Sequence, residues 1–147
     1  MFSTQEYETS KIVSGTPKRI VEIFHNPDEF FRLNPLVVSV CADPTTPQSH
    51  TVVDKLTILG YFKTTISYTC AARFLEDGIE VDVKAGMGTK THNIFKVKQG
   101  PDEETSEIYH RVVTTGLFFL MPYIGKTQRE AHETLLDRLH LKLTNEN

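Results

Sequence analysis

Residues 131–143 read AHETLLDRLHLKL, and this stretch decides the fold. The apolar residues and one histidine recur at intervals of three and four, which places them on one side of an α-helix. That side carries Ala131, His132, Leu135, Leu136, Leu139 and Leu143, and charged residues lie mostly on the other. The helix is predicted to run from about Gly125 onwards, and its apolar side needs another layer to pack against.

That layer is predicted to be an antiparallel β-sheet. β-Branched runs separated by turn clusters fill the chain from Pro35 to Thr115, and Asp77-Gly78 is a strong hairpin signal. Residues 62–74 alternate between apolar and polar side chains, as in a strand with one dry face. We expect seven strands, at residues 2–13, 36–41, 50–59, 62–74, 79–85, 89–98 and 107–115.

Two short helices are predicted between the first and second strands. Thr16 can cap a helix with Pro17 at its first position, and that helix runs to about His25. Asn26 repeats the pattern, with Glu29 placed to complete a capping box, and the second helix ends near Asn34. The expected fold is therefore α+β, a strongly bent seven-stranded antiparallel sheet wrapped around a long carboxy-terminal helix, in a single domain of residues 1–147.

Composition narrows the function. The 147 residues carry a formal net charge of -3 without a long basic block, so nucleic acid is not an expected partner. The longest apolar run, residues 117–121, is far below the ~20 residues that span a bilayer, and no secretory signal pattern is visible. We expect a soluble cytoplasmic protein. No metal is expected, because His132 and His140 are eight residues apart, which is not a metal-ligand spacing. No cofactor is expected either, and Gly86-Met87-Gly88 lacks the rest of a dinucleotide or phosphate loop.

The order of elements carries a resemblance to a known superfamily. Two short helices around HNPDEFFRLNP (residues 25–35), and a terminal helix after the apolar loop GLFFLMPYIG (residues 116–125), resemble the START-like, helix-grip superfamily of polyketide cyclases and Bet v 1-like proteins. The same two stretches are similar to those of small fungal proteins with this fold. The resemblance implies a hydrophobic cavity between sheet and terminal helix. It also implies binding of lipids, sterols or polyketides, catalysis on them, or a chaperone-regulating role.

Three residues are candidates for catalysis. His132 lies within the apolar side of the terminal helix, where a neutral imidazole suits proton transfer, although a core histidine bonded to a carbonyl is the alternative. Tyr123 is the polar group of the loop before that helix. Arg111 belongs to a strand with two possible orientations. Either Tyr109, Arg111, Val113 and Thr115 face the cavity, or Ile108, His110, Val112 and Thr114 do.

The expected ligand-binding residues come from the dry faces of the strands, the apolar loop and the terminal helix. Tyr68 is an expected helper, because a buried phenol needs a partner for its hydroxyl, and a satisfied core tyrosine is the alternative. The loop 116–125 is interpreted as a rim or lid, with a remainder exposed to a membrane, a partner protein or a second copy of the chain. The expected set is Tyr68, Ile66, Val83, Asn93, Phe95, Tyr109, Val113, Phe119, Met121, Gln128, Leu135 and Leu136.

Three functions remain open from the sequence. The first is a cofactor-independent cyclase or isomerase of secondary metabolism, which folds a polyketide or terpenoid into a reactive shape around His132. The second is a non-catalytic carrier of a lipid or another hydrophobic molecule. The third is a protein-interaction module with a filled interior, and a homodimer would use the same exposed loop.

Overall fold

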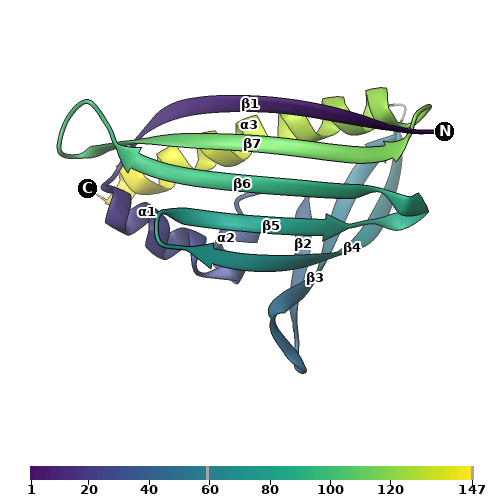
Figure 1. Ribbon diagram of the computed structural model, residues 1–147, viewed down its shortest axis with the longest axis horizontal. Helices are drawn as coiled ribbons and strands as arrows, with labels where there is room; N and C mark the ends of the chain where they lie inside the picture. The colour runs from purple at the N-terminus through teal and green to yellow at the C-terminus, as the bar shows by residue number, and fades with distance from the viewer. Residues whose placement is uncertain (59, 147) are drawn as a thin grey trace.

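The computed structural model describes residues 1–58 and 60–146, and one seven-stranded antiparallel sheet dominates it (Figure 1). The strands follow the spatial order β1-β7-β6-β5-β4-β3-β2. The elements in chain order are β1 (Phe2–Ser14), α1 (Pro17–Phe24), α2 (Pro27–Phe31), β2 (Val37–Asp43), β3 (Thr46–Ile58), β4 (Phe62–Leu75), β5 (Gly78–Lys84), a 3₁₀ turn η1 (Gly86–Gly88), β6 (Lys90–Gln99), β7 (Thr105–Leu117) and α3 (Met121–Glu146).

The long helix α3 lies across one face of the sheet, beside β1 and β7 (Figure 1). Three contacts tie it to β1: Lys11 pairs with Asp137, the backbone N–H of Ser14 donates to His140 Nδ1 at 3.0 Å, and Tyr7 meets His132. The predicted α+β architecture, a bent sheet around a carboxy-terminal helix with two short helices after the first strand, is confirmed.

Two elements begin four residues earlier than predicted. β3 begins at Thr46, four residues before the expected His50, and the expected last residue of that strand, Leu59, lies outside the described residues. The prediction that α3 begins at about Gly125 is wrong, because α3 begins at Met121. Pro122 does not interrupt α3, because the first turn of a helix has no use for the N–H that proline lacks.

The short helices α1 and α2 form one end of the molecule, which we call the closed end. Thr16 Oγ1 accepts from the N–H of Arg19, and Asn26 Oδ1 accepts from the N–H of Glu29, both at 3.3 Å, so both predicted caps are present. Their apolar faces are buried with the second half of α3, which fills the closed end with side chains: Ile20, Ile23, Phe24, Phe30, Phe31, Leu33, Leu135, Leu139 and Leu143.

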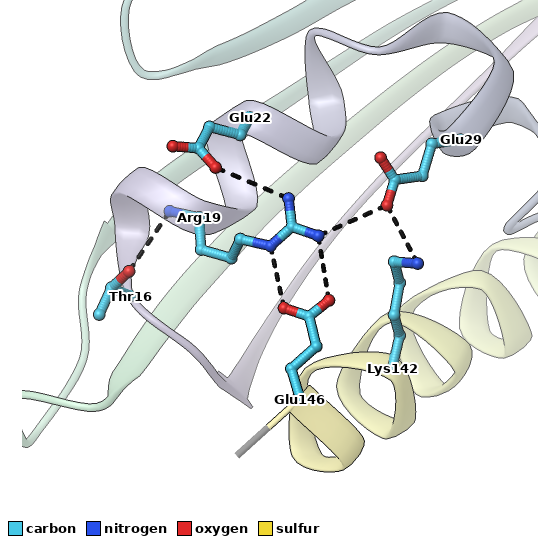
Figure 2. A network of polar contacts seen from close by, with 6 residues as sticks. All are labelled: Thr16, Arg19, Glu22, Glu29, Lys142 and Glu146. Atoms are coloured by element: carbon cyan, nitrogen blue, oxygen red, sulfur yellow. Dashed lines mark hydrogen bonds and ion pairs between the residues drawn. The ribbon is translucent and has the colours of Figure 1, made fainter.

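An ionic network on the surface of the closed end joins the last turn of α3 to the short helices (Figure 2). The guanidinium of Arg19 makes two hydrogen bonds to the carboxylate of Glu146, at 2.9 and 3.0 Å. Glu29 receives Lys142 at 3.0 Å and Arg19 at 3.6 Å. The Glu29 carboxylate thus serves this network and does not complete the predicted capping box, because the N–H of Asn26 donates to the carbonyl of Ile23.

Candidate functional site

A cavity of about 530 Å³ lies between the first half of α3 and the sheet. Apolar side chains from β3, β4, β5 and α3 make up much of its wall, and a few polar groups are set among them. Its large exposed lining residues are Met87, Tyr123 and Ile66, at 64%, 41% and 40%, and they lie where the cavity opens. The lining is Asn34, Leu36, Asp54, Leu56, Ile66, Ser67, Tyr68, Val83, Ala85, Gly86, Met87, Thr89, Thr91, Asn93, Tyr123, Ile124, Thr127, Gln128, Ala131 and His132.

The inner end of this cavity adjoins a smaller space of about 70 Å³ next to the closed end. Tyr68, Val83, Asn93 and His132 line both spaces. Phe95 and Leu135 line only the smaller one, where packing against the core leaves little room. The cavity is therefore wide at its mouth and narrow where α3 meets the core.

The wall of the cavity contains one buried carboxyl group, that of Asp54. Asp54 is 6% exposed, and Oδ1 accepts a hydrogen bond of 2.8 Å from the hydroxyl of Tyr68. Burial raises the pKa of Asp54 above its ordinary value, and the Tyr68 hydrogen bond opposes that shift in part. Burial, followed by the Asp54 charge, raises the pKa of Tyr68, so Tyr68 is the donor. Among the described residues, no basic side chain pairs with Asp54.

His132 lines the cavity from α3 and is held by a tyrosine. The Tyr7 hydroxyl lies 2.6 Å from His132 Nδ1, and burial raises the pKa of Tyr7, so the phenol keeps its proton. When that proton is donated to Nδ1, the neutral ring carries its own proton on Nε2. Burial lowers the pKa of His132 to about 4, which leaves the ring uncharged near neutral pH.

A second histidine, His110, lies behind His132 on the inner face of β7. It is 0% exposed, stacks on Phe95 with ring centroids 3.8 Å apart, and its Nε2 lies 3.1 Å from Asn93 Oδ1. Burial, and then proximity to His132, lowers the pKa of His110 to about 2. Two neutral histidines, packed edge to face with ring centroids 4.7 Å apart, thus support the cavity wall at Asn93 and His132.

A polar cluster fixes the helix to the sheet nearer the mouth. Gln128 Nε2 donates to Thr91 Oγ1 at 3.0 Å, and Thr114 Oγ1 donates to Gln128 Oε1 at 2.9 Å. Both ends of the Gln128 amide are thereby satisfied within the protein. Gln128 positions the first half of α3 over the cavity and keeps one N–H and one oxygen lone pair for other partners.

The structure brings many of the predicted site residues together. The main cavity is lined by His132, Tyr123, Tyr68, Ile66, Val83, Asn93 and Gln128, and the smaller space also by Phe95 and Leu135. Leu136 and Met121 are buried at 3% and 1% but lie outside both linings. Leu136 belongs to the helix–sheet core, and Met121 packs under the last residues of β7 near Gly116.

The remaining four predicted residues point away from the cavity. Arg111 bonds to Glu6 Oε1 at 2.6 Å, and Tyr109 donates to Glu8 at 2.9 Å, both on the outer face of the sheet. Val113 shares that face, and Phe119 is 60% exposed. Of the two orientations open for this strand, the structure has the one with Ile108, His110, Val112 and Thr114 inward. Placing Arg111, Tyr109 and Val113 in the cavity was therefore wrong, because strand parity sends them outward.

Asp54 and Tyr7 are among the polar residues of the site that were not predicted from the sequence. Asp54 stands two residues from both Val52 and Leu56, so it alternates in phase with the apolar face of β3. That parity was the available signal, because a carboxylate in phase with a dry face is unusual. Tyr7 gave no comparable signal, since its neighbours in β1 are mainly polar and its partner is 125 residues away.

Solved structures place this fold in a known class. A START superfamily protein from Mycobacterium smegmatis superposes with a TM-score of 0.74 at 13% identity, covering 97% of this chain and 99% of that one. The di-domain ARO/CYC StfQ from the steffimycin biosynthetic pathway superposes with a TM-score of 0.70 at 13% identity, covering 97% of this chain and 51% of that one. Ara h 8.0201 superposes with a TM-score of 0.60 at 9% identity, covering 90% of this chain and 95% of that one. The chain has a START-like, helix-grip fold.

The family is narrower than that class. Residues 13–145 match the family described as a domain of unknown function, DUF7053, and the chain belongs to it. No curated protein matches the sequence. In the described part of the chain, no helix is long and apolar enough to cross a membrane, and no group of three or more His, Cys, Asp or Glu is arranged to hold a metal ion.

Proposed function

We propose that this protein binds a mainly apolar small molecule, a polyketide, terpenoid or lipid, in the cavity between the sheet and α3. The observation that carries this proposal is the open cavity of about 530 Å³ beside a well-packed core. Its size falls within the ~300–1,000 Å³ range of small-molecule sites. StfQ, one of the structural relatives, is an ARO/CYC protein of a biosynthetic pathway, which is consistent with a ligand of this kind.

The lining specifies how such a molecule would be oriented. Leu36, Leu56, Ile66 and Val83 offer apolar surface, which favours a hydrocarbon skeleton. Asp54 is a buried polar group of the wall with unused hydrogen-bonding capacity, because its carboxyl accepts one bond where about four are possible. A polar group of the ligand would therefore lie at Asp54, with the apolar remainder towards the mouth.

Blocking the cavity tests this proposal. Val83→Trp adds a bulky ring to a side chain that lines both spaces, so the affinity for a neutral apolar fluorescent probe is expected to fall roughly tenfold or more. Val38→Trp is the matched control, because Val38 is 52% exposed on β2 and outside the lining. Equal affinities for both variants and the unmodified protein, with folding verified by circular dichroism, would rule out this cavity as the binding site.

A second candidate, proton-transfer catalysis on the bound molecule, is favoured by the Asp54–Tyr68 pair. A buried carboxyl with a raised pKa can act as a general acid or base nearer to neutral pH than an ordinary aspartate. His132, with a pKa of about 4, is a weak base and is better suited to donating a hydrogen bond from Nε2. A cyclase or isomerase step of secondary metabolism would then centre on Asp54, with His132 orienting the substrate.

Isotope exchange distinguishes this enzyme from a carrier. The protein is purified from its host with its own ligand and incubated in D₂O, and the ligand is analysed by mass spectrometry. An enzyme is expected to exchange a carbon-bound hydrogen and to lose that exchange in Asp54→Asn, while ligand binding persists. A ligand that leaves chemically unchanged and without deuterium indicates a carrier.

A further inference from the structure

Exposed apolar side chains gather at the mouth of the cavity. Five of them, which we call the mouth patch, are Phe2, Met87, Phe118, Phe119 and Tyr123, at 53%, 64%, 59%, 60% and 41% exposure. They come from the start of β1, the β5–β6 connection, the β7–α3 connection and the first turn of α3. Figure 1 shows these segments at one end of the molecule, opposite the closed end.

Specific contacts hold the parts of the mouth patch together. The N–H of Phe118 donates to the carbonyl of Met1 at 2.8 Å, and the rings of Phe118 and Phe119 pack edge to face with centroids 5.7 Å apart. A Cβ added at Gly88 would lie 3.0 Å from the ring of Phe2. Met87 and Tyr123 both line the cavity. The patch is thus one surface, continuous with the opening of the ligand site.

The same end of the molecule is positively charged, although the whole chain carries a formal charge of -3. Residues 1–5, 84–90 and 114–128 contain Lys84, Lys90 and Lys126 and no Asp or Glu. Lys84 and Lys90 stand opposite each other at the last pair of the β5–β6 ladder, a like-charge arrangement that costs stability. The nearby carboxylate of Glu6 is engaged by Arg111.

We propose that the mouth patch docks on the surface of a membrane rich in anionic lipids. Apolar side chains at the centre would enter the boundary between headgroups and acyl chains, and the lysines would meet the negative headgroups. Neither part suffices alone, because stable attachment to a bilayer surface needs two such signals. The complementary charge favours a bilayer over a second copy of this chain, which would present the same three lysines. Docking there sets the cavity opening against the lipid.

Vesicle sedimentation tests the docking surface without any cavity ligand. The protein is expected to sediment with vesicles of phosphatidylcholine plus phosphatidylserine, weakly or not at all with phosphatidylcholine alone, and less as salt rises. Phe119→Ser should lower the partition coefficient roughly tenfold or more. Leu141→Ser is its matched control, because Leu141 is equally exposed at 60% but lies on the second half of α3, and its partition coefficient should not change.

The charge contribution has its own matched pair on β6. Lys90→Gln should weaken binding to the anionic vesicles about fivefold, which is the share of one lysine near such a surface. Lys96→Gln removes the same charge from the same strand face away from the mouth, and it should leave binding unchanged. Equal losses in both variants would show that only net charge matters and would overturn the proposal.

Two other results would also overturn it. One is the absence of sedimentation with anionic vesicles. The other is self-association that Phe119→Ser abolishes in analytical ultracentrifugation while vesicles are not bound, because the patch would then belong to a second copy. The cavity proposal stands apart from these outcomes, since Phe119 lies outside the lining and Phe119→Ser should still bind the neutral apolar probe.

Discussion

The two halves of α3 do different work on the same sheet. In the second half, Leu135, Leu139 and Leu143 are 4%, 0% and 2% exposed and pack into the closed end. In the first half, Tyr123, Ile124 and Gln128 line a cavity, and polar bonds hold that half in place. The contrast indicates that the short helices α1 and α2 fill the space under one half of α3, while the other half covers an open space. Stability and ligand binding are thereby assigned to different halves of one helix.

The largest expected difference between the halves is in their response to truncation. Leu139→Ala leaves a void in a filled core and should lower the free energy of unfolding by about 4 kcal/mol. Ile124→Ala removes a similar side chain from the wall of an existing cavity and should cost about 1 kcal/mol. Urea denaturation measures both. Similar losses in the two variants would mean that the first half of α3 is packed as tightly as the second.

Two neutral histidines, His132 of α3 and His110 of β7, should make the free energy of unfolding depend on pH. The pKa values of His132 and His110 are lowered from 6.5 to about 4 and about 2. Below about pH 6.5 the unfolded chain therefore binds protons at these two histidines that the folded chain does not bind. The stability that the two neutral histidines contribute is fully present above about pH 6.5. It declines as the pH falls towards their pKa values in the folded state. From about pH 7 to about pH 5.5 the loss should be about 2 kcal/mol.

Urea denaturation across this pH range checks the prediction. The raised pKa of Asp54 acts in the opposite sense and offsets part of the loss. His132→Gln should make the free energy of unfolding depend less steeply on pH, because only one of the two histidines, His110, then differs in protonation between the folded and unfolded states. A pH profile that is flat in the unmodified protein would contradict the assignment of both histidines as neutral in the fold.

The smallest expected effect concerns the ionic network of the closed end (Figure 2). The side chains of Arg19 and Glu146 are each 36% exposed, so water and salt screen their bonds. Glu146→Gln should lower the free energy of unfolding by less than about 1 kcal/mol, and less again in high salt. Affinity for an apolar probe should not change. A loss comparable to that of Leu139→Ala would show that this network, rather than apolar packing, fixes the second half of α3.

The fold was predictable because its signals are local. The period of residues 131–143, the proline-started helices and the alternation in β4 each depend on near neighbours in sequence. The cavity was predicted only from the resemblance to the START-like superfamily, because an empty space depends on side chains from many strands at once. Arg111 shows the limit of this reasoning. Alternation says that Arg111 and His110 face opposite ways, but the choice between them depends on pairing with Glu6 of β1, which is 105 residues away.

The boundary of α3 shows a related limit. The apolar run 117–121 and Pro122 together predicted a loop, but the chain uses proline to start the helix instead. Tertiary packing accompanies the earlier start, because Met121 in the first turn is 1% exposed and packs against Gly116 of β7. At Gly125 the tip of the Gln5 side chain occupies the space beside the missing Cβ, 2.5 Å from its position. A helix interior is an unfavourable place for glycine on local grounds alone, so the sequence by itself favoured a later start.

The pairing of β1 with β7 has a consequence for how the chain folds. Phe2 pairs with Leu117 and Ser14 with Thr105, so within this sheet the first strand in chain order pairs with the last one. Until β7 has been synthesised, β1 has no partner, and the five strands β2–β6 present an open edge at β6. Contacts of such long sequence separation form slowly, because a long loop must lose conformational entropy before the stabilising contacts can form. Completion of the β1–β7 pair, with α3 settling behind it, is therefore expected to be the late step of folding.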